Sequence, residues 1–470
     1  MQNKSIEVTG VVDSAKFFGM PLGITVLTIL CMLVDGFDLQ TMAFVGPALV
    51  TDWGIDRALL TPAMTGGMIG MAIGSVTLGW AGDRIGRKGA YVICMVFLFA
   101  GSLLSAYAQG VWDLTAYRIL TGIGLGGVTP LAATMITEWT PKKSRNVAVA
   151  CAIVAVPLGG MIGAGIAQWI IPAHGWRSIF FVGAVMPFIF TAVAWFLLPE
   201  SPKFLAHHPE QHPKLARLLN RLLREKRFDG TEAFVVAEPP APPGNWFATI
   251  MKPPYTSVTL LLWAAFAFNT LCLYSYVNWL PTVLSYTGLP LHTSLQGSKL
   301  FNFGGFFGAV GGAVLIGILG SRIVGSTLSF IGAIATFFVG MLIAGTTADS
   351  AAGLLFLIFI AGTALNGMQA FLYAVGAHSY PTYIRASGVG CAQTVSRIGG
   401  VLSTFVGGTY FAIEPTPPAG YFFFFVAACI LVVVVSFFSL RTHIPGKKKL
   451  EALQAQEAEQ AALQKSVSSS

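Results

Sequence analysis

Apolar residues run along this chain in long, almost uninterrupted blocks that short polar stretches separate. Each block holds about 20 residues, enough for one helix to cross the hydrocarbon core of a bilayer. The pattern therefore predicts an all-α polytopic membrane protein with about twelve transmembrane helices. Their expected starts lie near Phe18, Pro62, Gly89, Trp112, Val147 and Trp176 in the first half, and near Thr256, Gln296, Ile323, Ala351, Ala386 and Gly420 in the second.

The composition excludes an ordinary soluble protein. Hydrophobic residues make up 54% of the 470 residues and charged residues only 10%, whereas soluble domains carry about 25% charged residues. A soluble protein with a very large core would not repeat apolar blocks of membrane-spanning length along its whole chain. All six cysteines lie inside predicted spans without a CxxC spacing, so we expect small apolar residues there and predict neither a metal site nor a cofactor.

The basic residues are distributed unevenly, and this predicts the orientation. The net charge of +8 would by itself also fit a nucleic-acid partner, but lysines and arginines gather in alternate loops. The loops of the opposite side hold little beyond Arg57, Arg177 and Lys299. Cytoplasmic loops carry such an excess, so we expect an inner-membrane protein with both termini cytoplasmic and the lipid bilayer, not nucleic acid, as its partner. The basic clusters lie at residues 84–88, 142–145 and 214–227, at Arg385 and at residues 447–449.

Two related halves are expected. Pro141 and Arg145 recur as Pro381 and Arg385, and a second, weaker match shares nearly the same offset. Repeats of this kind are common in transporters, whose sites lie where the repeats meet. The predicted organisation is a cytoplasmic leader (1–17), an N-terminal six-helix bundle (18–198), a cytoplasmic central loop (199–254), a C-terminal six-helix bundle (255–440) and a cytoplasmic tail (441–470).

The central loop has a pattern of its own. Residues 214–227 alternate leucines with lysines and arginines at helical spacing, which predicts a basic amphipathic helix on the anionic inner leaflet. Residues 239–244 read PPAPPG and are predicted to be a non-helical linker.

Two acidic residues, Asp35 and Asp38, fall deep inside a predicted span. A charged carboxylate near the centre of a membrane helix costs at least about 2.5 kcal/mol, so such a residue is expected to be functional. Spaced three apart, the two share one helix face, where like charge and burial both favour the protonated form. We predict that they take up a proton outside and release it inside; the alternative is that they only hydrogen-bond neighbouring helices.

Arg118 and Arg397 are the basic residues that fall inside predicted spans. A guanidinium in a low dielectric needs a carboxylate partner. The chain offers the aspartates of the first span, which would make a structural ion pair, and a substrate carboxylate is the other candidate.

The loop from Gly79 to Lys88 is a candidate gate on the cytoplasmic side. Its glycines permit a tight turn, and Asp83 can pair with a nearby arginine or accept from backbone N–H groups at a helix N-terminus. Contacts of this kind can form in one conformation and break in another. A solvated charged turn is the alternative.

These motifs carry a resemblance to a known family. Gly79-x-x-x-Asp83-Arg84-x-Gly86-Arg87-Lys88 resembles the signature loop of the major facilitator superfamily, and Glu138-x-x-Pro141-x-x-x-Arg145 and Pro199-Glu-Ser-Pro202 are similar to its later cytoplasmic motifs. Asp35-Gly36-Phe37-Asp38 resembles the DGxD motif of aromatic acid:proton symporters, the group of 4-hydroxybenzoate/protocatechuate and benzoate permeases. Residues 118–127, 278–282, 366–369 and 380–388 look like that group's fourth, seventh, tenth and eleventh span patterns.

The resemblance implies two pseudo-symmetric six-helix halves around a cavity that opens alternately to each side. It also implies secondary active symport of a small aromatic acid anion with protons, without covalent catalysis. The predicted site residues are Asp35 and Asp38 for proton coupling; Arg118, Tyr274, Tyr276, Asn278, Trp279, Asn366, Gln369 and Arg397 for substrate binding; and Gly79, Asp83, Arg84, Gly86, Arg87, Glu138 and Arg145 for gating.

One departure and several alternatives bound this prediction. Ser321 precedes Arg322 where the family's second-half loop keeps an aspartate, so a symmetric gate in that half is not predicted. A symporter for a non-aromatic acid such as muconate or a dicarboxylate, a drug-type exporter and a membrane sensor are the alternatives. An enzyme is not expected, because the sequence has no Ser/His/Asp arrangement, metal-spaced histidine cluster or Walker loop. Protons fit the buried carboxylates best, and sodium stays open.

Overall fold

Twelve long helices build the molecule. The computed structural model describes residues 5–236, 246–347, 350–440 and 442–447, and within them twelve helices have 20 or more residues. The first six are α2 (Met20–Trp53), α3 (Thr61–Ile85), α4 (Arg87–Ala106), α5 (Val111–Trp139), α6 (Lys142–His174) and α7 (Arg177–Leu197). The second six are α11 (Thr256–Tyr286), α12 (Leu291–Leu319), α13 (Ser321–Ile343), α14 (Ala352–Ser379), α15 (Thr382–Ala412) and α16 (Gly420–Ser439).

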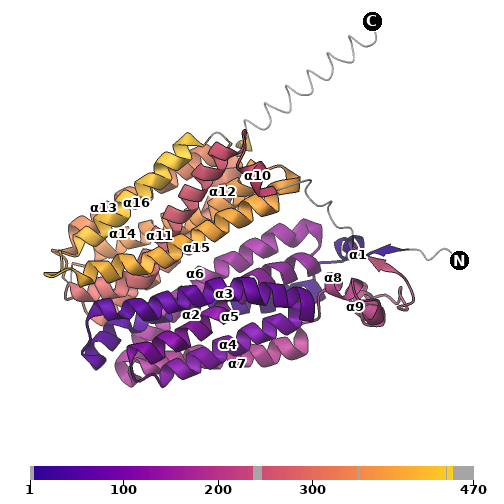
Figure 1. Cartoon of the computed structure of the whole chain (residues 1–470), viewed down its shortest axis with the longest axis horizontal. Coiled ribbons are helices and arrows are strands. Elements are labelled where there is room, and N and C mark those ends of the chain that lie inside the picture. The colour runs from indigo at the N-terminus through magenta and orange to yellow at the C-terminus, as the bar shows by residue number, and fades with distance from the viewer. Residues whose placement is uncertain (1–4, 237–245, 348–349, 441, 448–470) are drawn as a thin grey trace, which may run out of the picture.

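These helices form two bundles. In Figure 1 the purple N-terminal helices and the orange to yellow C-terminal helices make two groups that lie against each other. Among the described helices, 11 are long and apolar enough to cross a membrane; the remaining long helix is α15, which carries Arg385 and Arg397. The prediction of an all-α polytopic membrane protein with two six-helix halves is confirmed.

The two ends of the molecule differ in charge, and we call them the basic face and the far face. The basic face consists of residues 84–88, 140–145, 199–236 and 442–447. The far face consists of residues 54–60, 107–110, 175–176, 287–290 and 413–419. Both ends of the described chain lie at the basic face, as Figure 1 shows for the N-terminal end beside α1 and α8.

The two halves are joined from the middle of the molecule to the far face. One apolar cluster contains residues of both halves, among them Leu60 and Phe411, whereas near the basic face each half has a cluster of its own. In this conformation the far face is therefore closed between the halves. Within the described residues, the side chains that hydrogen-bond across the halves are Gln40 with Asn302, Thr65 with Thr404, and Gln168 with both His292 and Gln296.

Short elements cover the basic face of the first half. The predicted leader contains β1 (Ile6–Glu7) and α1 (Val8–Ser14), and β1 pairs in parallel with β2 (Phe234–Val235) of the central loop. Other short elements are η1 (Arg57–Leu60), α8 (Pro202–Ala206), η2 (Pro209–Gln211), α9 (His212–Leu223) and α10 (Trp246–Ile250). The predicted linker at residues 239–244 and the tail beyond residue 447 lie outside the described residues.

The amphipathic helix of the central loop is present, but it faces protein. It is α9, and it ends at Leu223, because Arg224 adopts a left-handed backbone conformation with φ of 60°. Leu215, Leu219 and Leu222 are buried in a cluster with Val8 of α1. The prediction that this apolar face contacts a lipid leaflet is wrong, because the leader and α8 already cover it.

Glycines bring α3 and α5 into backbone contact. A Cβ atom added to Gly74 would lie 2.0 Å from the carbonyl oxygen of Ile123, and one added to Gly126 would lie 2.1 Å from that of Met71. Both distances are far below van der Waals contact, so only glycine fits. This close approach fixes the position of α5, the helix that carries Arg118.

We expect Gly74→Ala to destabilise the protein by at least about 2 kcal/mol, because the added methyl group forces α3 and α5 apart. Gly79→Ala on the same helix is the matched control, since among the described residues nothing lies within 4 Å of its added Cβ. Thermal unfolding of the purified protein in detergent measures both. Equal melting temperatures for the two variants would contradict the packing argument.

Candidate functional site

A buried ion pair lies in the centre of the first half. Arg118 of α5 and Asp38 of α2 are 3% and 0% exposed. Arg118 Nη1 donates to Asp38 Oδ2 at 3.1 Å, and Nη2 donates to the Asp38 carbonyl oxygen at 3.1 Å. The other carboxylate oxygen, Oδ1, accepts from Ser102 Oγ of α4 at 2.6 Å. Both carboxylate oxygens therefore have donors, and three helices meet at this one group.

The two charges depend on each other. Taking an ion out of water costs several kcal/mol, and only a well-placed partner offsets that cost. Because the guanidinium already donates twice to Asp38, a substrate carboxylate would have to displace the aspartate to bind Arg118. The geometry thus favours the structural ion pair for Arg118 over direct substrate binding.

Asp35 lies one turn earlier on α2 and is held much less firmly. Its side chain is 4% exposed. Oδ2 accepts from Thr129 Oγ1 at 3.3 Å, and Oδ1 has no hydrogen-bond partner among the described residues. The positive charge of Arg397, on α15 of the other half, interacts electrostatically with both Asp35 and Tyr274. Asp35 is thus a buried carboxylate with one unused acceptor, and a cation of the other half acts on it through space.

A pocket adjoins Arg118 where the halves meet. It is mostly apolar, and its polar side chains are Arg118 itself and Asn278 of α11. Asn278 Nδ2 donates to Ser403 Oγ of α15 at 3.3 Å. The apolar lining consists of Leu39, Met42, Ala63, Met64, Gly67, Met68, Met71 and Leu125.

Two predicted amides of α14 are engaged within the second half. Gln369 Oε1 accepts from Asn269 Nδ2 at 2.7 Å and from Thr270 Oγ1 at 3.3 Å. Asn366 Nδ2 donates to the Gly362 carbonyl oxygen at 3.1 Å. Tyr274 is half-buried.

Tyr276 and Trp279, predicted as substrate contacts, lie in the core instead. Both are 0% exposed. Tyr276 stacks on Phe301 with ring centroids 4.9 Å apart and donates to Thr336 Oγ1 at 3.1 Å. The reason is their spacing on α11: Tyr274 and Asn278 are four residues apart and share a face, whereas Tyr276 and Trp279 point to other helices.

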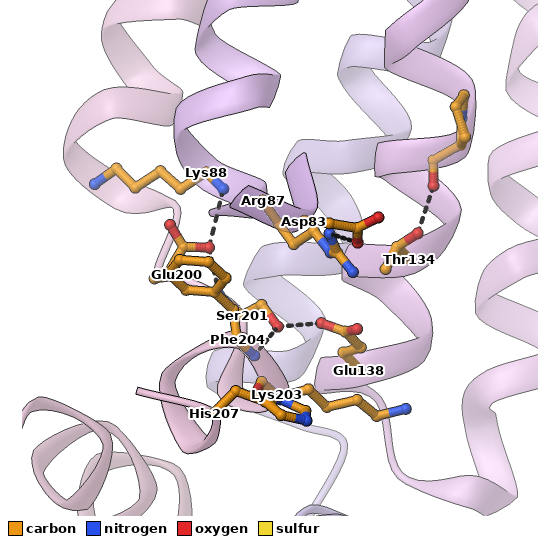
Figure 2. A network of polar contacts seen from close by, with 11 residues as sticks. Asp83, Arg87, Lys88, Thr134, Glu138, Glu200, Ser201, Lys203, Phe204 and His207 are labelled. Carbon is orange, nitrogen blue, oxygen red and sulfur yellow. Dashed lines mark hydrogen bonds and ion pairs between the residues drawn. The ribbon is translucent and has the colours of Figure 1, made fainter. Parts of the chain in front are cut away.

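A polar network occupies the basic face of the first half, as Figure 2 shows. Asp83 forms an ion pair with Arg87 one helical turn later. Glu200, which follows α7, accepts from the backbone N–H of Lys88 in the first turn of α4 at 3.1 Å. Glu200 is therefore the acceptor at this helix N-terminus, and Asp83 makes the expected pair with a nearby arginine.

Gly86 explains why Glu200 can approach. Its backbone has φ of 96°, a conformation that favours glycine. A Cβ atom there would lie 2.2 Å from Glu200 Oε2. The glycine of the loop motif thus admits the carboxylate of the later Pro199–Pro202 motif.

The remaining charged gating candidates bind other partners at the same face. Glu138 accepts a hydrogen bond from Ser201, also drawn in Figure 2. Arg145 Nη2 donates to Asp13 Oδ1 of α1 at 2.7 Å, and the same oxygen accepts from the Lys142 backbone N–H at 2.9 Å. The leader therefore caps the start of α6.

Gly79 and Arg84 lie apart from this network. The Arg84 guanidinium sits over the Trp80 ring, 4.3 Å from its centroid, and Gly79 has no close neighbour among the described residues.

In the second half, Ser321 and main-chain groups of Ile444 take the place of the missing aspartate. Ser321 N donates to the Ile444 carbonyl oxygen at 2.9 Å, and Ser321 Oγ accepts from Ile444 N at 2.7 Å. A segment that follows the last span thus holds this loop, as the segment around Glu200 holds its counterpart in the first half, but without a carboxylate.

Sequence reasoning missed Ser102, Thr129, Glu200, Ser201 and Asp13 as partners of the predicted residues. Ser102 and Thr129 are ordinary span residues, and no local pattern distinguishes them. Glu200 and Ser201 stood in the Pro199–Pro202 motif, and only their contacts with the loop show their place in the network.

Comparisons with known proteins agree with this architecture. The family profile described as "Major Facilitator Superfamily" matches residues 28–404. A gallate transporter of Pseudomonas putida is 32% identical over 410 residues, which cover 87% of this chain and 89% of that protein. The 4-hydroxybenzoate transporter PcaK of Acinetobacter baylyi is 32% identical over 413 residues, covering 86% and 88%.

Solved structures share the fold. The crystal structure of a D-xylose-proton symporter has a TM-score of 0.68 and 17% identity, and the match covers 91% of this chain and 98% of that one. The inward open conformation of the xylose transporter XylE from E. coli has a TM-score of 0.69, with coverages of 92% and 99%.

We expect Asp38→Asn to destabilise the protein by about 3–5 kcal/mol, because a buried Arg118 is left without its counter-charge. The double variant Asp38→Asn/Arg118→Gln is expected to recover most of that loss, since no isolated charge remains. Thermal unfolding of wild type, both single variants and the double variant gives the coupling energy. If the stability losses of the two single variants simply add up to that of the double variant, the pair is not coupled.

Proposed function

The chain belongs to the Major Facilitator Superfamily, among its aromatic acid transporters, and from this premise we propose that it imports a small aromatic carboxylate together with protons. It is a multi-pass membrane transporter and not an enzyme. The proposed substrate class is that of 4-hydroxybenzoate, protocatechuate and benzoate. The proposed orientation places the basic face and both termini in the cytoplasm of an inner-membrane protein, because cytoplasmic loops carry the excess of lysine and arginine.

One observation carries the coupling mechanism: the buried Asp35 carboxylate has an oxygen, Oδ1, without a hydrogen-bond partner among the described residues, and the charge of Arg397, on the other half, acts on it through space. When Asp35 is charged, it attracts the Arg397 guanidinium. When Asp35 takes up a proton, that attraction ends and the guanidinium is available to a substrate carboxylate. Proton and anion therefore bind together, and loss of the proton on the cytoplasmic side restores the Asp35–Arg397 attraction and releases the acid.

The other two ionisable groups keep fixed partners in this scheme. Asp38 and Arg118 neutralise each other, and Ser102 satisfies the second carboxylate oxygen. They hold the first half in shape while Asp35 changes its charge. Of the two aspartates of one motif, Asp35 thus carries the proton and Asp38 is the structural counter-ion.

Alternating access supplies the movement. The far face is closed between the halves by apolar packing and by the hydrogen bonds of Gln40, Thr65 and Gln168, so the conformation described is closed toward the outside. Opening to the outside breaks these contacts and brings the basic ends of the halves together. The loop network around Glu200 is proposed as the element of the first half that changes partners in this step.

The test is uptake of labelled 4-hydroxybenzoate into cells at acidic external pH, with and without a protonophore. Wild type is expected to accumulate the acid, and the protonophore is expected to abolish accumulation. Asp35→Asn should let the acid equilibrate but not accumulate, whereas the exposed control Asp113→Asn should behave as wild type. Accumulation that survives the protonophore rules out proton coupling; competition with muconate and other non-aromatic acids tests the substrate class.

Arg397→Gln is expected to raise the KM for 4-hydroxybenzoate about ten- to hundredfold, because a charge-assisted hydrogen bond to a carboxylate contributes about 1.5–3 kcal/mol. Arg322→Gln, which removes an exposed arginine of α13, is the matched control. Initial uptake rates over a range of acid concentrations measure both. An unchanged KM for Arg397→Gln would show that the substrate carboxylate binds elsewhere.

A further inference from the structure

One buried glycine of α15 has no packing reason to be a glycine. A Cβ atom added to Gly399, Gly407 or Gly408 would lie 2.1 Å from an atom of Ala267, Trp279 or Thr61, respectively, so packing forbids a side chain at those three positions. Gly400 differs, because the closest atom to its added Cβ would be Thr270 Cγ2 at 3.8 Å. That is ordinary van der Waals contact, yet Gly400 is buried.

The space beside Gly400 lies where three helices from both halves meet. The next atoms around the added Cβ are Met68 Sδ of α3 and Tyr274 Cδ2 of α11, each at 3.9 Å. Gly400 itself is on α15. The absent side chain thus leaves a space about the size of a methyl group beside a thioether of the first half and an aromatic ring of the second.

This space is placed next to the charged groups of the proposed mechanism. Arg397 and Gly400 are three residues apart on α15 and so share a helix face, one turn apart. Tyr274 interacts electrostatically with Arg397. Met68 also lines the pocket that contains Arg118 and Asn278, so the space and that pocket share a wall.

The walls have the chemistry that suits a flat ring. Methionine sulfur makes favourable contacts with aromatic rings, and its flexible side chain adapts to different ring substituents. A tyrosine ring offers stacked or edge contacts. Met64 and Met71, which lie near Met68 on α3 and line the same pocket, extend this thioether surface.

We propose that Gly400, Met68 and Tyr274 form a slot that receives one edge of the aromatic ring of the substrate, one helical turn from the arginine that holds its carboxylate. This assignment rests on the proposed function and deepens it, since it makes Gly400 the residue that sets the size of the accepted ring. A side chain at position 400 would occupy the place of the ring.

Gly400→Ala tests the slot directly. The variant is expected to fold, because its added methyl meets no atom closer than 3.8 Å, and to raise the KM for 4-hydroxybenzoate at least about tenfold because the methyl takes ring space. Gly390→Ala is the matched control on the same helix, since it is exposed and nothing among the described residues lies within 4 Å of its added Cβ.

Met68→Leu tests the chemistry of the wall and does not depend on the glycine variant. It keeps the volume and removes the sulfur, so the KM for 4-hydroxybenzoate is expected to rise about two- to tenfold. Inhibition by cyclohexanecarboxylate, which has no π face, should stay the same. Met135→Leu, at a fully buried position of the first half, is the control.

The outcomes separate this inference from the function on which it rests. If wild type takes up no aromatic acid, the proposed function falls and the slot with it. Suppose that wild type takes up the acid and that Arg397→Gln raises the KM for 4-hydroxybenzoate. If Gly400→Ala and Met68→Leu then leave this KM unchanged, the function stands and the slot is overturned. A raised KM in both variants, with the controls unchanged, supports the slot.

Discussion

The Asp38–Arg118 ion pair is the contact on which the arrangement of the first half depends. Burial removes both charges from bulk water, so each needs the other, and their geometry requires α2, α4 and α5 to meet at one point. Glycines at the α3–α5 contact allow α5 to take that position. Because Asp38 occupies both Nη atoms of Arg118, a second cation, Arg397, is proposed to bind the substrate anion.

The two aspartates of one short motif have different surroundings. Asp38 has donors on both oxygens, whereas Asp35, one turn away, has a single weak donor and an unused oxygen. A group whose partners are complete resists a change of charge, and a group with an unmet acceptor can gain or lose a proton at lower cost. In the proposed mechanism, the proton site and the substrate site are coupled through Arg397, whose charge acts on Asp35 from the other half.

The basic face shows how the halves have diverged from their shared plan. In the first half, carboxylates accept from backbone N–H groups at helix starts: Glu200 at the start of α4 and Asp13 at the start of α6. In the second half, uncharged hydrogen bonds between Ser321 and the backbone of Ile444 hold the corresponding loop. Charged contacts are exchanged with water more readily than buried main-chain bonds, which supports the proposal that the first half changes partners at this face.

The sequence by itself determined the membrane class, the twelve helices, the two halves and the motifs, because hydrophobic length and charge placement are local properties that a bilayer reads directly. It also singled out Asp35, Asp38, Arg118 and Arg397, since a charge inside an apolar span is conspicuous without any structure. It could not decide which aspartate pairs with which arginine, which side of α11 faces the pocket, or that protein covers α9. Those outcomes depend on how helices far apart in the chain rotate and approach each other, and only the tertiary structure fixes that.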